Sequence, residues 1–156
     1  MLLRIILILG LFAFLSSCSK NETLYEPTYK IDPYKTYNEG LKAFQENQFF
    51  LASKKFSESE INFTSPELAA KSAIMSSFAF YGINFYEEAE ENLIRYLKTY
   101  PGDTYVMYAH YLLAIIYFEQ IADEKNDLKP LLDAKEKINF FLKKYPNSVY
   151  AIDLNL

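Results

Sequence analysis

Apolar residues recur at helical spacing from Tyr34 to the end of the chain, and no segment shows the polar–apolar alternation of a strand bounded by turns. Helix starts are marked by polar residues that can cap backbone N–H groups, with proline tolerated in the first turn. The candidates are Asp32-Pro33, Ser65-Pro66, Asn84 with Glu87 three residues later, Asp103 and Ser148. The pattern predicts an all-α fold.

Small and aromatic residues also repeat along the chain at a spacing of 37 residues. The aligned sets are Gly40, Ser77 and Ala114; Phe44, Tyr81 and Phe118; Phe49 and Tyr86; Ala52 and Ala89; and Phe56 and Leu93. The second half of the third unit is displaced by eight extra residues in or near 122–130, after which Ala134 aligns with Ala89. Each unit is predicted to be a helical hairpin in which small residues let paired helices approach closely.

This arrangement of small, aromatic, alanine and proline positions resembles the tetratricopeptide repeat, with Tyr100-Pro101 and Tyr145-Pro146 ending two of the units. The resemblance implies three repeats over residues 34–147, and a fourth that starts at 148–156 and is cut short. Such hairpins stack into a solenoid whose concave face is built from the first helix of each pair.

Aromatic residues make up 17% of the chain, and the repeat gives them a structural role. Most of the rings are expected to pack between helices, while the remainder can line a groove that binds a peptide or partner. Four residues on first helices are candidates for that groove: Phe44, Tyr81, Tyr111 and Phe118. Helix phase alone does not separate groove from core, so we assign them no site.

The N-terminus carries Arg4, an apolar run at 5–15 and the ending Leu15-Ser16-Ser17-Cys18. The run is too short to cross a bilayer comfortably and indicates a secretory signal. Its ending resembles the lipobox of bacterial lipoproteins. That resemblance implies a signal peptide at 1–17, acylation of Cys18 including a palmitate chain, and a lipidated tether at 18–33. The alternative is an ordinary signal peptide or N-terminal anchor with an incidental cysteine.

Composition excludes several kinds of chemistry. The net charge of −4 leaves no basic patch of the kind that nucleic-acid binding needs, and with Cys18 acylated no thiol remains for a disulfide or a nucleophile. His110 is the single histidine and the chain has four glycines, so a catalytic triad, a His-based metal cluster and a phosphate loop all lack parts. We expect no catalytic, metal or cofactor-binding residues, and His110 is expected to be a surface or half-buried packing residue.

Two charged groups are expected to be solvated helix faces. The acidic group, Glu87, Glu88, Glu90 and Glu91, falls in the first turns of a helix, where it complements the helix dipole. The basic group is Lys135, Lys137, Lys143 and Lys144. As an alternative, the basic group could meet an acidic partner.

Local sequence within the repeats is similar to the BamD family of outer-membrane assembly lipoproteins. The similarity rests on the lipobox and on three stretches: Asn84-Phe85-Tyr86-Glu87-Glu88-Ala89, Tyr105-Val106-Met107-Tyr108 and Tyr145-Pro146-Asn147-Ser148 with Tyr150. It implies a non-enzymatic, lipid-anchored subunit of the β-barrel assembly machinery on the periplasmic face of the outer membrane. Implied partners are the barrel insertase, other lipoproteins of the machinery and unfolded β-barrel proteins. Ser19 after Cys18 fits outer-membrane sorting.

The chain departs from that family in length. The family carries about five repeats, whereas this sequence stops at Leu156 soon after a fourth would begin. We therefore expect a fragment or a truncated relative that keeps the repeats implicated in substrate recognition.

Two other functions remain open at this point. One is a different periplasmic tetratricopeptide scaffold, such as a Tol-associated cell-division coordinator, although such proteins typically carry a coiled coil that this chain lacks. The other is an accessory subunit of a cell-wall hydrolase complex, which co-purification of a catalytic partner would reveal.

Overall fold

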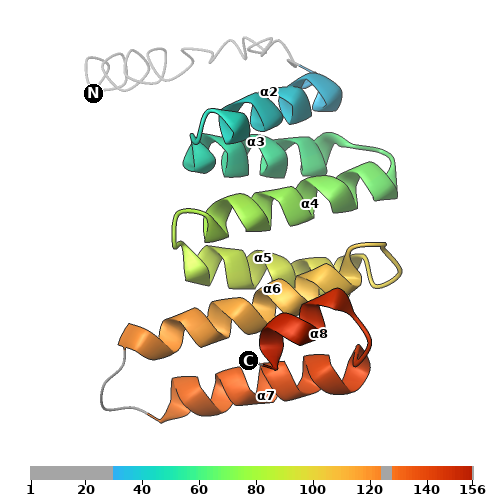
Figure 1. Ribbon diagram of the computed structural model, residues 1–156. Helices are drawn as coiled ribbons and strands as arrows, with labels where there is room; N and C mark the ends of the chain where they lie inside the picture. Colours follow the sequence, from blue (N-terminus) through green and yellow to red (C-terminus); the bar gives the residue numbers. More distant parts are fainter. Residues whose placement is uncertain (1–29, 124–127, 156) are drawn as a thin grey trace, which may run out of the picture. The chain divides into compact units, whose positions relative to one another are not determined.

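Helices stack one after another along the described part of the chain (Figure 1). The structure is a computed structural model that describes residues 30–123 and 128–155. Every regular element in those two ranges is helical, which confirms the predicted all-α fold. The predicted signal peptide, Cys18 and most of the tether lie outside the described residues, as does part of the predicted insertion, at 124–127.

The helices form consecutive hairpins that resemble tetratricopeptide repeats. Their bounds are α2 (Pro33–Gln45), α3 (Phe49–Asn62), α4 (Pro66–Tyr81), α5 (Tyr86–Thr99), α6 (Val106–Glu119), the 3₁₀ turn η1 (Gln120–Asp123), α7 (Lys129–Lys144) and α8 (Val149–Leu154). Each α-helix contacts the next, and α4 also contacts α6. The alternate helices α4 and α6 therefore lie close together on one face, with α8 following along the same face (Figure 1).

Three of the predicted helix starts are confirmed. The Asp32 carboxylate accepts hydrogen bonds from the backbone N–H groups of Tyr34 and Lys35. Ser65 caps α4 by accepting from the backbone N–H of Leu68, and Ser148 caps α8 in the same way. These caps satisfy backbone donors that have no partner within the helix.

The predicted caps at Asn84 and Asp103 are wrong. Asn84 has φ 60°, a left-handed conformation that closes the α4–α5 turn. The N-cap position of α5 is therefore occupied by Phe85. Asp103 lies in the turn before α6, where its carboxylate accepts hydrogen bonds from the Tyr105 backbone N–H and from the Tyr96 hydroxyl. Both residues organise turns rather than helix ends, and local sequence does not distinguish the two uses.

Small residues at the repeated positions are buried where helices cross. Gly40, Ser77, Ala114, Ala52, Ala89 and Ala134 are all buried. A Cβ atom added to Gly40 would lie 2.9 Å from the ring of Phe56, so this crossing between α2 and α3 leaves no room for a side chain. The close approach predicted from the repeat is thus present in the structure.

The described residues contain two apolar clusters. The N-terminal cluster consists of Ala43, Ala52, Phe56 and Ala79. The central cluster draws on α4, α5 and α6 and consists of Ala70, Ala73, Ile74, Phe80, Ala89, Leu93, Tyr96, Ala109, Leu112, Leu113 and Ile116.

Candidate functional site

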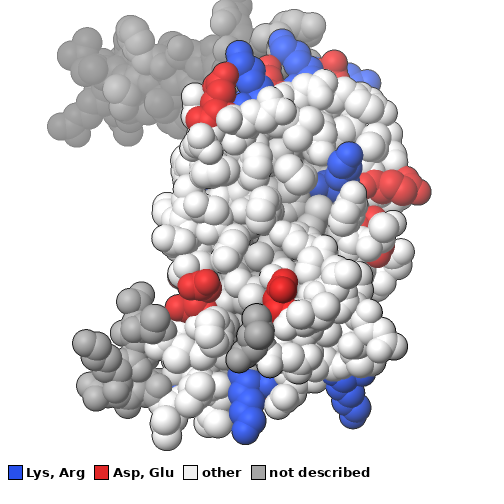
Figure 2. All heavy atoms as spheres, in the orientation of Figure 1, with Lys and Arg blue, Asp and Glu red and all other residues white. Residues whose placement is uncertain are grey.

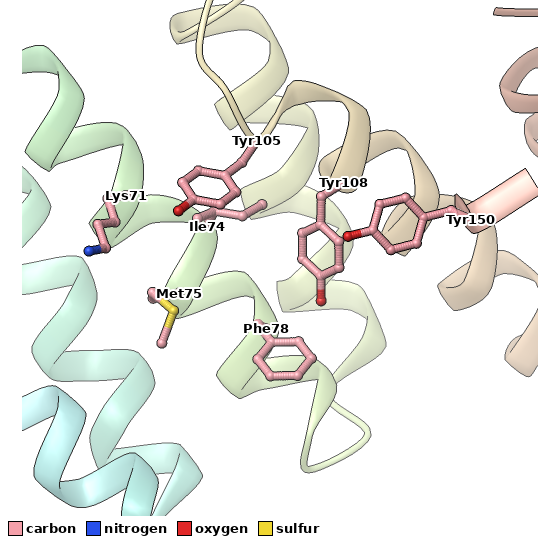
Figure 3. A pocket seen from close by; sticks show the side chains of 7 residues that line it. All are labelled: Lys71, Ile74, Met75, Phe78, Tyr105, Tyr108 and Tyr150. Carbon is pink, nitrogen blue, oxygen red and sulfur yellow. The ribbon is translucent and has the colours of Figure 1, made fainter. Parts of the chain in front are cut away.

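A hollow of about 260 Å³ lies on the face built from first helices (Figure 3). We call it the aromatic groove and define it by the residues that line it: Lys71, Ile74, Met75, Phe78, Tyr105, Tyr108 and Tyr150. Lys71 is the one charged residue among them, and the rest are apolar or aromatic. Figure 2 shows few charged side chains over the middle of this face.

Helical spacing explains why these residues converge. On α4, Lys71, Met75 and Phe78 are four and three residues apart and so share one side of the helix. Tyr105 precedes α6 and Tyr108 lies in its first turn. Tyr150 comes from α8, which the Ser148 cap begins two residues earlier. The groove is therefore assembled from three first helices.

The rings of the groove contact one another at the distances typical of aromatic pairs. The ring centroids of Phe78 and Tyr108 are 6.3 Å apart, and those of Tyr108 and Tyr150 are 5.7 Å apart. Tyr150 also stacks on Tyr111, at 4.5 Å. Burial raises the pKa of Tyr108 to about 12, so its phenol is neutral at physiological pH. The wall of the groove is apolar but retains hydroxyl groups that can hydrogen-bond.

The four residues singled out from the sequence have different environments. Phe44 packs between Phe49 and Phe78, with centroids 5.0 and 5.6 Å away, and so belongs to the packing between hairpins. Tyr81 and Tyr111 are half-buried beside the groove. Phe118 is 56% exposed.

Sequence reasoning did not select the residues that line the groove. The family resemblance included Tyr105, Tyr108 and Tyr150, but it assigned them no groove. No sequence pattern indicated a role for Lys71 or Met75. The spacing of 71, 75 and 78 was the available signal, but it fits a core stripe equally well.

The other residues considered from the sequence take no part in the groove. His110 packs beside Phe140 and Tyr145, and burial, followed by the nearby charge of Lys144, lowers its pKa to about 4. Glu90 accepts a 2.5 Å hydrogen bond from the Tyr117 hydroxyl, whereas the three other glutamates of its group are exposed. In the basic group Lys137 lies 5.3 Å from the Tyr117 ring and the other three lysines are exposed.

Two kinds of feature are absent from the described residues. No group of three or more His, Cys, Asp or Glu residues in 30–123 and 128–155 is placed to hold a metal ion. Over the same residues, no helix has the length and apolar character needed to cross a membrane.

Comparison with known proteins places the helical region in a family. Residues 30–156 match the YfiO family, described as an outer membrane lipoprotein. The chain belongs to this family. Outer membrane protein assembly factor BamD of Caulobacter vibrioides is 33% identical over 120 residues, and the BamD of Rickettsia prowazekii is 27% identical over the same length. The predicted resemblance to BamD is confirmed.

The matched region is only part of those relatives. Each alignment covers 77% of this chain but 39% of the Caulobacter protein and 48% of the Rickettsia protein. The chain thus spans less than half the length of these two YfiO-family relatives.

Proposed function

We propose that the protein is a non-enzymatic outer-membrane lipoprotein of the β-barrel assembly machinery. It faces the periplasm and aids the assembly and insertion of outer-membrane β-barrel proteins by binding other proteins. Membership of the YfiO family and the names of its two BamD relatives support this role. Its partners are the barrel insertase, other lipoproteins of the machinery and unfolded barrel proteins.

In this proposal the aromatic groove is the site at which an unfolded barrel protein binds. An unfolded barrel protein offers extended segments in which apolar and polar residues alternate, with aromatic residues near the ends of the apolar stretch. Side chains on one side of such a segment can fill the apolar hollow, while the tyrosine hydroxyls hydrogen-bond to its polar groups. Binding without chemistry is enough for this role, because the segment must later be released to the insertase.

Acylation of Cys18 supplies the membrane attachment in this proposal. Each buried methylene contributes about 0.8 kcal/mol, so three acyl chains anchor the protein stably. Replacing Cys18 by serine should abolish incorporation of radiolabelled palmitate and move the protein out of the membrane fraction. Continued palmitate labelling of the C18S protein would overturn the assigned lipidation site.

Tyr105 offers a test of the groove, because its side chain is 43% exposed and lines the hollow. The probe is a fluorescent, terminally capped peptide that alternates tyrosine and threonine. Tyr105→Ala should weaken its binding to the full chain by about tenfold, the loss expected for a central aromatic contact. Phe50→Ala is the matched control, since Phe50 is an exposed aromatic, at 52%, outside the groove. Equal affinities for the two variants would contradict the proposal.

Affinity capture tests the assignment to the machinery. The full chain is isolated from solubilised envelopes, and its companions are identified by mass spectrometry. Recovery of the barrel insertase supports the proposal. Recovery of Tol components without the insertase would overturn it in favour of a cell-division scaffold.

A further inference from the structure

The aromatic groove has charged groups of opposite sign at its two ends. Lys71 is exposed and lines the end nearest the start of α4. Glu119 is exposed at the last position of α6, and α4 and α6 both end on the left in Figure 1. Lys71 and Tyr81 are ten residues apart on α4, a distance of about 15 Å along the helix axis. An extended segment of four or five residues, at about 3.3 Å each, covers that length.

Two carboxylates, those of Glu119 and Asp153, lie toward the end of the aromatic groove opposite Lys71. The charge of Glu119 contributes, after burial, to raising the pKa of Tyr81, whose ring lies 6.4 Å from that of Phe78 in the groove. The Asp153 carboxylate lies 3.4 Å from the hydroxyl of Tyr111, the residue that stacks on Tyr150. Both acids therefore sit beside rings that border the hollow.

These charges are not compensated by an ion pair in the described part of the chain. Among the described residues no ion pair involves Lys71, Glu119 or Asp153. Glu67 lies one turn before Lys71 on α4, but its carboxylate accepts a 2.7 Å hydrogen bond from the Ser65 hydroxyl. Lys71 instead lies with its amine 5.7 Å from the centroid of the Tyr37 ring, which extends the aromatic surface toward α2.

We propose that this separation of charge selects the charge pattern of the bound segment. The preferred segment is extended, places an acidic side chain beside Lys71, fills the hollow with aromatic side chains, and places a basic side chain beside Glu119 and Asp153. The inference rests on the proposed function, because it concerns the segment that the aromatic groove holds. The inference adds that an aromatic segment with the same charge at both ends binds the groove more weakly than one with opposite charges.

Four capped peptides with the same alternating tyrosine–threonine centre test the proposal. Two carry glutamate at one end and lysine at the other, in the two possible orders, one carries glutamate at both ends and one carries lysine at both ends. We expect the better mixed peptide to bind the full chain about two- to fivefold more tightly than either like-charged peptide, the range for solvent-exposed ion pairs. The preference should vanish at 1 M salt, where charges are screened within about 3 Å.

Charge reversal of the protein gives a second readout. Lys71→Glu should transfer the preference to the peptide with two lysines. The triple variant K71E/E119K/D153K, in which both ends have exchanged their charge, should restore the preference for a mixed peptide. Lys98→Glu is the matched control, because Lys98 is an exposed lysine in the last turn of α5, on a second helix. It should leave the ranking of the four peptides unchanged. Circular dichroism melts of all variants check that the fold is retained.

The outcomes separate this inference from the proposed function. If all four peptides bind equally well and Tyr105→Ala weakens them equally, the groove binds aromatic segments and the charge selection is wrong. If none of the peptides binds, the proposed function of the groove fails first. A preference that survives in K71E would also overturn the role of Lys71.

Discussion

The interface between α3 and α4 and the interface between α5 and α6 join neighbouring hairpins with different chemistry. Between α3 and α4, the hydroxyls of Ser57 and Ser76 are 2.8 Å apart, and Ser59 donates to Ser72 at 3.0 Å. Between α5 and α6, residues of the central cluster such as Leu93 and Leu112 are fully or almost fully buried. The first interface combines small polar groups with the small apolar cluster of Ala52, Phe56 and Ala79, and the second buries large apolar side chains.

This difference indicates how stability is distributed. Burial of apolar surface contributes about 25 cal/mol per Å², whereas a satisfied hydrogen bond adds about 1 kcal/mol net. The first hairpin, α2–α3, therefore gains little from the serine contacts, and its apolar support comes from the smaller N-terminal cluster and from the Phe44–Phe78 ring contact. We expect it to open at a lower free energy than the part built around the central cluster.

The largest expected effect is in the central cluster. Leu93→Ala removes a side chain with no solvent exposure and should lower the free energy of unfolding by about 3 kcal/mol, through lost burial and the cavity left behind. Urea denaturation measures the loss. Ile94→Ala is the control, since Ile94 is 49% exposed and should change stability by less than about 0.5 kcal/mol. Similar losses in the two variants would contradict the packing described for α5.

The second prediction concerns the polar bridge from the first hairpin to the second. Arg95 donates to both carboxylate oxygens of Glu60, at 2.5 and 2.7 Å, and the Tyr100 hydroxyl donates to the same carboxylate at 3.0 Å. Glu60 is buried and Arg95 is about half exposed. Arg95→Met leaves a buried carboxylate short of partners and should cost about 2 kcal/mol, below the range for fully buried pairs because of that exposure.

A second variant sharpens this prediction. The variant E60Q/R95M removes the buried charge together with its partner and should be more stable than R95M alone. If the two variants unfold at the same urea concentration, the unpaired Glu60 carboxylate carries no penalty, and the reason given for the loss in R95M is wrong.

The third and smaller effect tests the crossing of α2 and α3. Gly40→Ala raises helix propensity by about 1 kcal/mol, but its new methyl group would lie 2.9 Å from the buried ring of Phe56. Overpacking costs about 1 to 3 kcal/mol, so we expect a net loss of about 1 kcal/mol. Hydrogen exchange should show the loss in the amides of α2 and α3 first. Gly102→Ala, with nothing within 4 Å of the added Cβ, should not destabilise the protein.

The position of Gly40 also shows how much of the fold could be predicted from the sequence. The repeat predicts a small residue at each helix crossing, because the spacing of small residues can be read directly from the sequence. The caps at Asp32 and Ser65 were predictable for the same reason, since a cap involves residues only two or three apart. The turn at Asn84 was not, because its left-handed conformation depends on how α4 and α5 pack.

The groove was less predictable than the helices. Phe44 and Phe78 lie on first helices and look alike in sequence, yet Phe44 packs between hairpins while Phe78 lines the hollow. Which side of a helix faces the groove depends on the rotation of each helix against its neighbours, and sequence spacing does not fix that rotation. Lys71 was missed because a single lysine in an apolar stripe has no local signature.

The smallest predicted effect is a dependence of stability on alkaline pH that is concentrated in the central region. Burial raises the pKa of Tyr108 to about 12, and burial together with the Glu60 carboxylate raises the pKa of Tyr100 to about 12. The pKa values of Tyr96 and Tyr117 are also raised, by burial and by the carboxylates of Asp103 and Glu90 respectively. In α2, burial also raises the pKa of Tyr37.

The sign of the pH effect follows from linkage. Folding favours the neutral phenol, so the contribution of these tyrosines is complete below pH 10, the usual pKa, and is lost as the pH rises from about 10 to 12. Urea midpoints measured at pH 9, 10 and 11 should fall, and Tyr108→Phe should reduce the fall because it keeps the ring and removes the titrating group. Tyr37→Phe is the matched substitution in the first hairpin and should reduce the fall less. If Y37F and Y108F reduce it equally, alkaline sensitivity is spread over both regions and the contrast between the two interfaces does not extend to their tyrosines.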